Sequence, residues 1–596
     1  MSIGKFRRVL CFGLIAALTS SVPASAVTVG KVLESDRGIV AAAHPLAAAA
    51  GAEILENGGN AIDAAIATSL ALGVVEPYAS SLFGEGYMVV RMADGKTWSI
   101  DFRSCAPAMA SYEQMAREGF KTTSEFSRKP QGACVPGVVA GISEVMKRGA
   151  TMSLAELAAP AIRCAEEGFE VNKTFSQLCK DNFELLTNNA PDFLNEGMPW
   201  EEGETFRNPQ LAATLRTLVD KGLDDFYQGS IADDVDAFMQ ENGGWIRKSD
   251  LQNYRAIERE PLQGTYKGYT ITVAGLPVGG PRLIENMNIF ENFNFANMGW
   301  DDPLRLHLMQ ETFLLTNEDL RAYCGDPAFS KTSERGMTSR EYAKLRMMDI
   351  RLDSATTSAD WFGGKNEAGN APAFEDVRMD LNRYMTMPAA AALPATDLYE
   401  SASTTHFSIV DRWGNAVAWT QTISAFFGTS CWVDGFFLNN EMGNFWSKPS
   451  AAGNGVSDIQ PGKRVRTTIA PMIVERAGRV RWVLGTPGGS RIIPTLSQML
   501  VDLIDFRMTL EETINSPKIM STFDTKEGVS LIEMESGYSA ETVKALEQGF
   551  GHKVSVRQFP DLYFGGPNAI ERRLFDGHLT GVGSVRRGGA AAAPEK

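Results

Sequence analysis

The chain has 596 residues, and its 57 Lys and Arg against 72 Asp and Glu give a formal net charge of −15. This length exceeds what one ordinary core needs and predicts several domains or one large layered body. The negative balance argues against nucleic acid or an anionic membrane surface as a partner.

The first 26 residues have the pattern of an export signal. Three cations within residues 5–8 precede the apolar run Val9–Leu18, and residues 24–26 (ASA) fit a cleavage site before Val27. A membrane anchor is the alternative, but a span needs about 20 apolar residues. Loss of three cations and no anions would change the charge from −15 to −18. We therefore expect a periplasmic or secreted protein without a membrane anchor.

Six cysteines follow this segment. Export permits disulfides, but their spacing cannot choose among the possible pairings. In a chain of this size, buried thiols or a single bridge are favoured. None has a histidine close by in the sequence or a C-x-x-C partner, which argues against a thiol nucleophile. They are Cys105, Cys134, Cys164, Cys179, Cys324 and Cys431.

The first part of the chain alternates strands with helices. Residues 38–58 predict a strand and then an alanine-rich helix, and a second helix is expected from an Asn60 cap to about Val75. Residues 86–102 alternate like a β-hairpin, and residues 137–182 have helical spacing.

The middle of the chain mixes helices with a single strand, expected at 265–277. Residues 303–323 predict an amphipathic helix. The segment 355–400 is rich in Ala, Pro and Asp, has weak periodicity and is the best linker candidate. The tail 588–596 has a composition typical of disorder. The whole pattern is that of an α/β body with helices on both sides of its strands.

A β-hairpin is expected directly after the linker. Residues 404–422 read TTHFSIV and AVAWTQT around the turn DRWGN, and both runs are rich in β-branched and aromatic residues. Folding about Trp413 places Thr404 opposite Thr422, because the two are equally far from the turn. Cross-strand partners have Cβ atoms about 4.5–5.5 Å apart. Two hydroxyls would therefore meet at the open end of the hairpin.

Thr404 is a candidate nucleophile. A Thr hydroxyl attacks poorly unless a base lies beside it, and a free α-amine on the same residue, with a pKa of about 8, is such a base. That amine exists only if the Ser403–Thr404 bond is cut, and the hydroxyl itself could attack the Ser403 carbonyl. The alternative is that Thr404 and Thr405 are ordinary strand residues.

Two further groups could assist such a nucleophile. Gly488 and Gly489 lie between an alternating strand and a helix, where backbone N–H groups can face an oxyanion; a tight turn is the alternative. Arg103 ends a predicted strand and could clamp a substrate carboxylate with two hydrogen bonds. A surface ion pair is the alternative for this arginine.

Other chemistries have no support in the sequence. The five histidines are not spaced as metal ligands, and no H-E-x-x-H is present. The chain also lacks a dinucleotide-binding glycine motif and a G-x-S-x-G elbow. Polar clusters at 439–444 and 467–468 would alone be turns and strand edges. We expect no metal and no cofactor.

These features resemble the γ-glutamyltransferase family, also called γ-glutamyl transpeptidase or glutathione hydrolase, over nearly all of the chain after residue 26. The resemblance implies an α/β (α+β) fold, the four-layer αββα sandwich of an N-terminal-nucleophile hydrolase. It also implies a proenzyme that cuts itself into a large subunit, 27–403, and a small subunit, 404–596, which remain together as a heterodimer. The motifs are ENGGNAIDAAIA at 56–67, SIDFRSCAPA at 99–108, CVPGVVAG at 134–141, TTHFSIVDRWGNAV at 404–417, FFLNNEM at 436–442, TPGGSRI at 486–492 and HLTGVGSVRR at 578–587.

The resemblance assigns roles to matching residues. Thr404 matches the family nucleophile and first residue of the small subunit, and Thr422 matches the hydroxyl that orients it. Gly488 and Gly489 match the oxyanion-hole glycines. Arg103 matches the arginine that binds the α-carboxylate of a γ-glutamyl group.

The residues that would bind the rest of the substrate follow the family pattern only in part. Thr467 and Thr468 stand where many members have a Ser pair touching the same carboxylate, and Glu441 matches a Gln or Glu near the α-amino group. Asn444 stands where γ-glutamyl-specific members typically have an Asp that pairs with the α-ammonium, and Ser424 stands where they have Asn. A substrate with a carboxylate but no amine, such as a glutaryl amide, becomes plausible.

The resemblance implies an exported hydrolase or transferase that cleaves glutathione and other γ-glutamyl amides through a Thr404 ester. The acceptor would be water, an amino acid or a dipeptide. One alternative is an acylase of the same family that removes a glutaryl or similar group. A second is a catalytically silent scaffold or binding protein of the same fold, against which the intact Thr404 and Thr422 argue.

Overall fold

The computed structural model describes residues 28–29, 32–330, 334–357, 403–450 and 455–595. The expected export signal and nearly all of the expected linker lie outside these residues. Within the described ranges, no helix combines the length and the apolar character that a membrane span requires.

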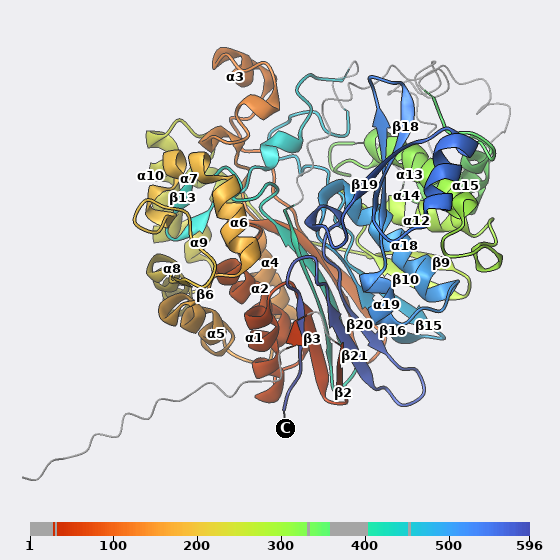
Figure 1. Ribbon diagram of the computed structural model, residues 1–596. Helices are drawn as coiled ribbons and strands as arrows, with labels where there is room; N and C mark the ends of the chain where they lie inside the picture. The colour runs from red at the N-terminus through yellow and green to blue at the C-terminus, as the bar shows by residue number, and fades with distance from the viewer. Residues whose placement is uncertain (1–27, 30–31, 331–333, 358–402, 451–454, 596) are drawn as a thin grey trace, which may run out of the picture.

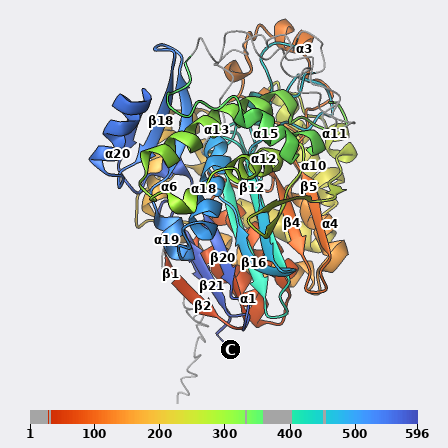
Figure 2. The same cartoon turned by 90° about the vertical axis from the view of Figure 1, so that its right-hand side faces the viewer.

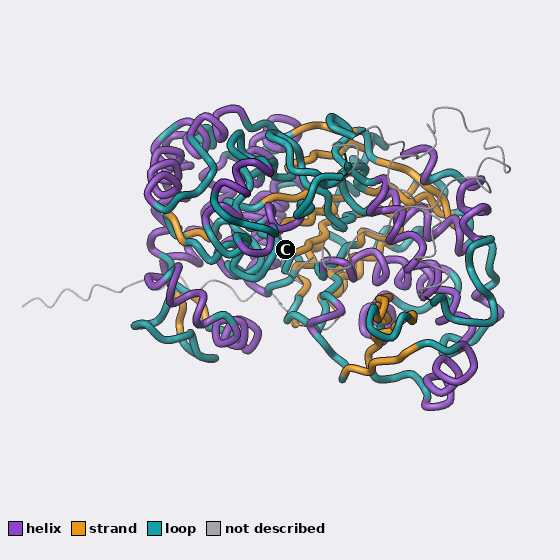
Figure 3. The backbone as a smooth tube through the Cα atoms, turned by 90° about the horizontal axis from the view of Figure 1, so that it is seen from above, coloured by secondary structure: helices purple, strands orange, loops and turns teal. Residues whose placement is uncertain are grey.

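Two antiparallel sheets lie face to face at the centre of the molecule, and helices cover the outer side of each (Figures 1 and 3). The order of the larger sheet is β1 (Thr28–Val29), β22 (Ala590–Ala592), β3 (Gly38–Ala42), β11 (Thr405–Asp411), β12 (Ala416–Thr422), β4 (Glu85–Arg91), β5 (Thr97–Phe102) and β8 (Ile257–Arg259). The order of the second sheet is β2 (Val32–Ser35), β21 (Leu579–Gly583), β20 (Asn568–Arg572), β16 (Arg479–Leu484), β15 (Met472–Arg476), β10 (Tyr269–Val273) and β9 (Leu262–Tyr266).

The central strands have no solvent-exposed face. Every residue of β11 and β12 is buried. Because side chains alternate along a strand, Ile409 joins the core under the helices of one layer, whereas Val410 joins the core between the sheets. The predicted four-layer αββα sandwich is confirmed by this arrangement and by the structural neighbours given below.

The helices of the first layer lie between β3 and β9 in the chain. They are α1 (Pro45–Glu56), α2 (Ala61–Val75), α4 (Val138–Gly149), α5 (Leu154–Glu167), α6 (Lys173–Asp181), α7 (Phe183–Asn189), α8 (Pro209–Lys221), α9 (Asp225–Gln228), α10 (Ser230–Glu241) and α11 (Lys248–Asn253). Helix α3 (Tyr112–Arg117) projects above this layer in Figure 1. The second layer faces the viewer in Figure 2. Its helices are α12 (Gly280–Phe290), α13 (Pro303–Tyr323), α14 (Glu334–Met337), α15 (Arg340–Met347), α18 (Ile492–Ile504), α19 (Leu510–Asn515) and α20 (Ala540–Lys544).

Three small sheets complete the chain. A mixed sheet beside α13 contains β17 (Ile519–Asp524), β18 (Val529–Glu535) and β19 (Lys553–Arg557). The two-stranded sheets are β6 (Phe169–Glu170) with β7 (Thr205–Phe206), and β13 (Trp432–Val433) with β14 (Phe436–Phe437).

The predicted helices around residue 60 are confirmed. The Asn60 side chain accepts a hydrogen bond from the Asp63 N–H at 3.1 Å, and the Asp63 carboxylate accepts one from the Asn60 N–H at 2.9 Å. This reciprocal capping box begins α2 at Ala61, and the helix ends at Val75. The hairpin at 86–102 is also present, as β4 and β5.

Three other predictions are wrong. The single strand expected at 265–277 is the hairpin of β9 and β10, which turns at Lys267 and Gly268, both with positive φ. The helix at 303–323 is buried on nearly all sides, so it is not amphipathic. The tail is ordered as far as the structure describes it, to residue 595, because Ala590–Ala592 form the buried strand β22, which pairs with both β1 and β3. Segment 137–182 is helical but is interrupted by β6.

All six cysteines beyond residue 26 are free thiols, four of them buried. Burial raises the pKa of Cys164 to about 11 and that of Cys105 to about 12. These groups remain protonated near neutral pH, which agrees with the argument against a thiol nucleophile.

Candidate active site

The hairpin of β11 and β12 brings Thr404 to Thr422. The register pairs Thr405 with Gln421 and His406 with Thr420, so the turn is centred as predicted. The Thr404 hydroxyl lies 3.2 Å from the Thr422 hydroxyl. The Ser424 N–H donates to Thr422 Oγ1 at 2.9 Å. The prediction that two hydroxyls meet at the open end of this hairpin is confirmed.

The Thr404 hydroxyl also contacts the carbonyl oxygen of Ser403, the residue just before it in the continuous chain. Thr422 Oγ1 lies 3.5 Å from the same oxygen. All three residues are buried. A hydroxyl is thus held against the carbonyl group of its own preceding peptide bond, with a second hydroxyl beside both groups. This geometry can support an intramolecular attack on that bond.

A buried network behind Thr404 was not identified from the sequence. The Thr405 hydroxyl donates to Glu76 Oε2 at 2.7 Å, and the Tyr78 hydroxyl donates to Glu76 Oε1 at 3.1 Å. Arg587 Nη1 donates to the Thr404 carbonyl oxygen at 2.6 Å. Burial raises the pKa of Glu76, and the Arg587 charge opposes this shift. Arg587 ends the last family-like motif, which was the only sequence signal for this network.

Gly488 and Gly489 form the turn between β16 and α18. Their φ values of 134° and 56° lie in the left-handed region, which glycine adopts without strain. A Cβ on Gly488 would lie 3.2 Å from the Cα of Gly565. The Thr468 hydroxyl donates to the Gly489 carbonyl oxygen at 2.7 Å and thereby holds the turn. A strand-to-helix turn of this kind suits the backbone donors of an oxyanion site.

A small recess opens beside Thr404. It includes four of the residues that the resemblance assigns to substrate recognition, and one of the two oxyanion-type glycines. Arg103, Gly488 and Thr468 are not among its lining residues. The lining residues are Ser403, Thr404, Thr422, Ser424, Glu441, Asn444, Thr467, Gly489 and Ile492.

Arg103 lies behind this recess and is bound by two carboxylates. The fully buried guanidinium forms ion pairs with Glu85 and, at 3.3 Å, with Glu441. Arg103 Nη2 also donates to the Val465 carbonyl oxygen at 3.1 Å. Burial lowers the pKa of Arg103, and Glu441 opposes this shift. A substrate carboxylate would therefore have to compete with carboxylates of the protein for this arginine.

Glu85 was missed from the sequence. It lies on β4 directly opposite Thr422, and its carboxylate accepts a hydrogen bond from the Ser104 N–H at 2.7 Å. The sequence held one signal for it. Residues 82–86 read LFGEG, with an acidic residue in a run that is usually glycine-rich in the family that the chain resembles. One cation and two anions therefore lie together beside the recess.

Asn444 uses its amide group within the protein. Its Nδ2 donates to Glu441 Oε2 at 2.8 Å and to Ser424 Oγ at 3.1 Å. Glu441 is consequently the residue that supplies a negative charge to the recess lining. Ser424 has a φ of 74°, an uncommon conformation for a residue other than glycine and one that occurs at functional sites.

The chain is similar to known proteins in both sequence and fold. The family described as Gamma-glutamyltranspeptidase matches residues 47–594. The chain is 34% identical over 540 residues to a glutathione hydrolase proenzyme of Escherichia coli strain K12, covering 88% of this chain and 87% of that protein. It is also 34% identical over 576 residues to the acylase ACY 1 proenzyme of Pseudomonas sp. strain SE83, covering 94% of each. The crystal structure of a cephalosporin acylase from Bacillus halodurans superposes with a TM-score of 0.82 at 27% identity, covering 97% of this chain and 99% of that one.

Proposed function

Because this chain belongs to the gamma-glutamyltranspeptidase family, we propose that it is an exported enzyme that cuts itself before Thr404 and then uses Thr404 as its nucleophile. The substrates are γ-glutamyl amides such as glutathione, and the acyl group passes to water, an amino acid or a dipeptide. The observation that carries the proposal is the contact of the Thr404 hydroxyl with the Ser403 carbonyl group, beside Thr422.

The first step is self-cleavage. Thr404 Oγ attacks the Ser403 carbonyl carbon, and the C–N bond breaks as the Thr404 nitrogen takes the hydroxyl proton. Ser403 is then held as an ester on Thr404 Oγ. Water hydrolyses this ester and leaves a Ser403 carboxylate and a free Thr404 amine. The products are the large subunit, 27–403, and the small subunit, 404–596, which remain associated.

The second step is turnover. The Thr404 amine accepts the proton of its own hydroxyl while Oγ attacks the γ-carbonyl carbon of the donor. Gly488 and Gly489 stabilise the oxyanion, and the leaving amine takes the proton. Water or an acceptor amine then attacks the γ-acyl ester and regenerates Thr404. Thr422 orients the hydroxyl in both steps.

Recognition of the donor rests on the recess beside Thr404. Glu441 pairs with the α-ammonium of a γ-glutamyl donor, because Asn444 has no charge and its amide hydrogens are directed to Glu441 and Ser424. Arg103, Thr467 and Thr468 are assigned to the α-carboxylate.

A glutaryl-type acylase is the second candidate. Asn444 favours it, because a glutaryl group has no ammonium for an aspartate to bind. The similarity to the acylase ACY 1 proenzyme and to the cephalosporin acylase structure gives the same support.

Two assays test these proposals. On a denaturing gel, the purified wild type should give two fragments and Thr404→Ala a single uncut chain. Rates with γ-glutamyl-p-nitroanilide and glutaryl-p-nitroanilide then separate the two substrate classes. A wild type that hydrolyses neither amide, or a Thr404→Ala variant that hydrolyses one at the wild-type rate, would overturn the assignment of Thr404.

A further inference from the structure

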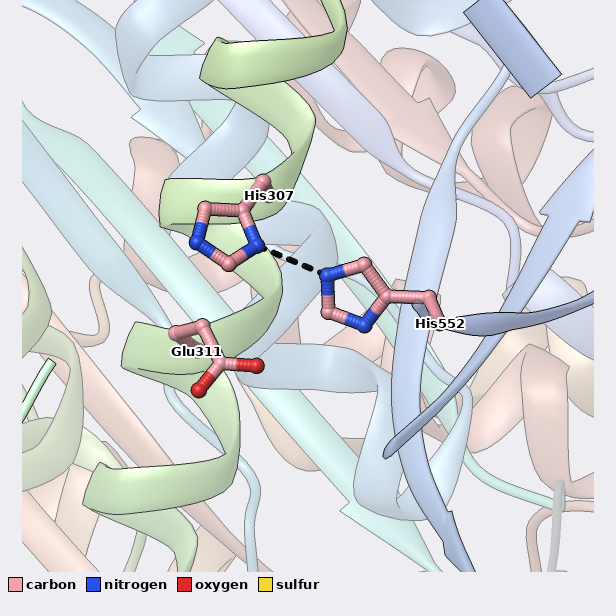
Figure 4. Close-up of side chains that lie close together, drawn as sticks. All are labelled: His307, Glu311 and His552. Carbon is pink, nitrogen blue, oxygen red and sulfur yellow. Dashed lines mark hydrogen bonds between the residues drawn. The ribbon is translucent and has the colours of Figure 1, made fainter. Parts of the chain in front are cut away.

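Three buried side chains from two distant parts of the sequence meet at α13 (Figure 4). His307 and Glu311 lie one helical turn apart on α13, and His552 directly precedes β19. Their potential ligand atoms all lie within 4.8 Å of one another. Among the described residues, no other group of three histidine, cysteine or carboxylate side chains is this close together. Linear spacing did not reveal this group, because the two histidines are 245 positions apart.

The outer ring nitrogens of both histidines are already held. His307 Nε2 lies 2.6 Å from the Arg351 carbonyl oxygen and donates to it, since a carbonyl oxygen only accepts. His307 Nδ1 therefore carries a lone pair, and it faces His552 Nε2 at 2.7 Å. His552 Nδ1 lies 2.9 Å from the Ser530 hydroxyl oxygen. Histidines that bind metals are typically oriented in this way through the other ring nitrogen.

The carboxylate is held equally firmly. Glu311 Oε1 accepts a hydrogen bond from the Thr356 N–H at 3.2 Å, and Oε2 accepts one from the Thr356 hydroxyl. The hydrogen bonds around both rings fit neutral imidazoles, the form that binds a metal ion, with His552 Nε2 donating to His307 Nδ1.

We propose that His307, Glu311 and His552 bind one divalent transition-metal ion, and that this ion is zinc. Two imidazole nitrogens and a carboxylate oxygen are a donor set that suits Zn²⁺, with the fourth position left to water or the second carboxylate oxygen. Tetrahedral binding at about 2.0–2.1 Å places two nitrogens about 3.4 Å apart, roughly 0.7 Å more than their present 2.7 Å, and both rings must also turn so that their lone pairs point at the ion. The His552 Nε2 proton moves to Nδ1 of the same ring, and Nδ1–H then donates a hydrogen bond to the Ser530 hydroxyl oxygen.

Such an ion would join two parts of the chain. It would connect α13 with the small sheet of β17, β18 and β19. If the proposed cut before Thr404 is correct, His307 and Glu311 belong to the large subunit and His552 to the small one. The ion would then hold the two subunits together, a structural role rather than a catalytic one.

Metal content tests this site directly. The full-length protein is stripped with EDTA, reloaded with zinc chloride, passed through a desalting column and analysed by mass spectrometry for metals. We expect about one zinc ion per chain and a raised thermal midpoint. His552→Gln and His307→Gln should each lower the retained zinc at least tenfold. Wild-type protein that retains no zinc, or variants that retain as much as wild type, would overturn the proposal.

A matched control distinguishes surface binding. His578 lies on the surface beside Asp36 and Glu34, so it is the natural site for adventitious metal. His578→Gln should retain the full zinc content. Loss of zinc from this variant alone would show that the metal binds at the surface and would contradict the α13 site.

A spectroscopic measurement covers the case in which the buried variants do not fold. X-ray absorption of zinc-loaded wild type should show two imidazole rings with nitrogens at about 2.0–2.1 Å. A first shell without two histidines would overturn the site. Zinc binding does not require the cut before Thr404, so Thr404→Ala should retain zinc even if it stays uncut. Failure of the metal site and failure of the proposed function are thereby distinguished.

Discussion

The Thr404 hydroxyl lies 3.2 Å from the Thr422 hydroxyl, although the two residues are 18 positions apart. Both hydroxyls are also near the Ser403 carbonyl oxygen. In the proposed self-cleavage, Thr422 is therefore placed to orient the Thr404 oxygen without taking part in bond formation itself.

Replacement of Thr422 tests this role. Thr422→Val keeps the shape of the side chain and removes the hydroxyl, so we expect self-cleavage to slow at least tenfold, which corresponds to about 1.4 kcal/mol of barrier. The fraction of cut chain is followed on a gel after synthesis. Thr420→Val is the matched control, because that hydroxyl lies on the same strand and bonds to His406 Nδ1 at 2.8 Å. Equal cleavage rates in both variants would remove Thr422 from the mechanism.

Glu85 should weaken the binding of anionic donors. It forms an ion pair with Arg103 and competes with a substrate carboxylate for the same guanidinium. We expect Glu85→Gln to lower the KM for glutaryl-p-nitroanilide by at least about threefold. Glu258→Gln is the control, because this substitution changes the net charge by the same amount but removes an ion pair with Arg148 at the surface. An unchanged or higher KM in Glu85→Gln would mean that Arg103 does not bind the donor carboxylate.

Asn444 should limit selectivity for γ-glutamyl donors. A charge-assisted hydrogen bond is about twice as strong as a neutral one, and Asn444 offers no charge. We expect the ratio of kcat/KM for γ-glutamyl over glutaryl p-nitroanilide to lie below about 100 in the wild type. Asn444→Asp should raise it about tenfold, or 1.4 kcal/mol. If the ratio stays the same, residue 444 does not contact the amine, and the acylase candidate loses its main support.

Much of this site could be predicted because it is local in the sequence. The turn around Trp413 fixes the register of β11 and β12, and the register alone brings Thr404 to Thr422. The two glycines at 488 and 489 lie at a strand-to-helix turn with a recognisable pattern. In each case, a few neighbouring residues determine the geometry.

The remaining features depend on contacts between distant segments. Glu85 and Glu441 reach Arg103 from separate elements, so the sequence alone did not show that this arginine is already paired. Composition predicted a disordered tail, but pairing with β3 orders Ala590–Ala592. Helix α13 was predicted to be amphipathic, yet charged side chains such as Arg305 and Asp319 are buried within the core.

Buried histidine should make the protein sensitive to acid. Burial lowers the pKa of His406 to about 3, below the value of about 6.5 for an unfolded chain. The unfolded state therefore binds more protons between these values, and stability falls as the pH drops below about 6.5, by up to about 1.4 kcal/mol per pH unit. His406 Nδ1 and Nε2 each contact a hydroxyl, on Thr420 and Ser408, which holds the ring in place.

Thermal midpoints between pH 7.5 and pH 5 measure this effect. His406→Gln should show a shallower loss of stability than the wild type over this range. His578→Gln should not, because a hydrogen bond to Asp36 raises the pKa of that partly exposed histidine. Parallel curves for wild type and His406→Gln would show that His406 is not the group that titrates on unfolding.

The central claim is that Thr404 cuts the chain at its own amino side. Sequencing the N-terminus of the smaller fragment from freshly purified, active protein tests it most directly. The predicted result is Thr-Thr-His-Phe, starting at Thr404, from wild type, and no fragment from Thr404→Ala. A fragment that begins at Thr405 or elsewhere, or active wild-type protein that remains a single chain, would contradict the account.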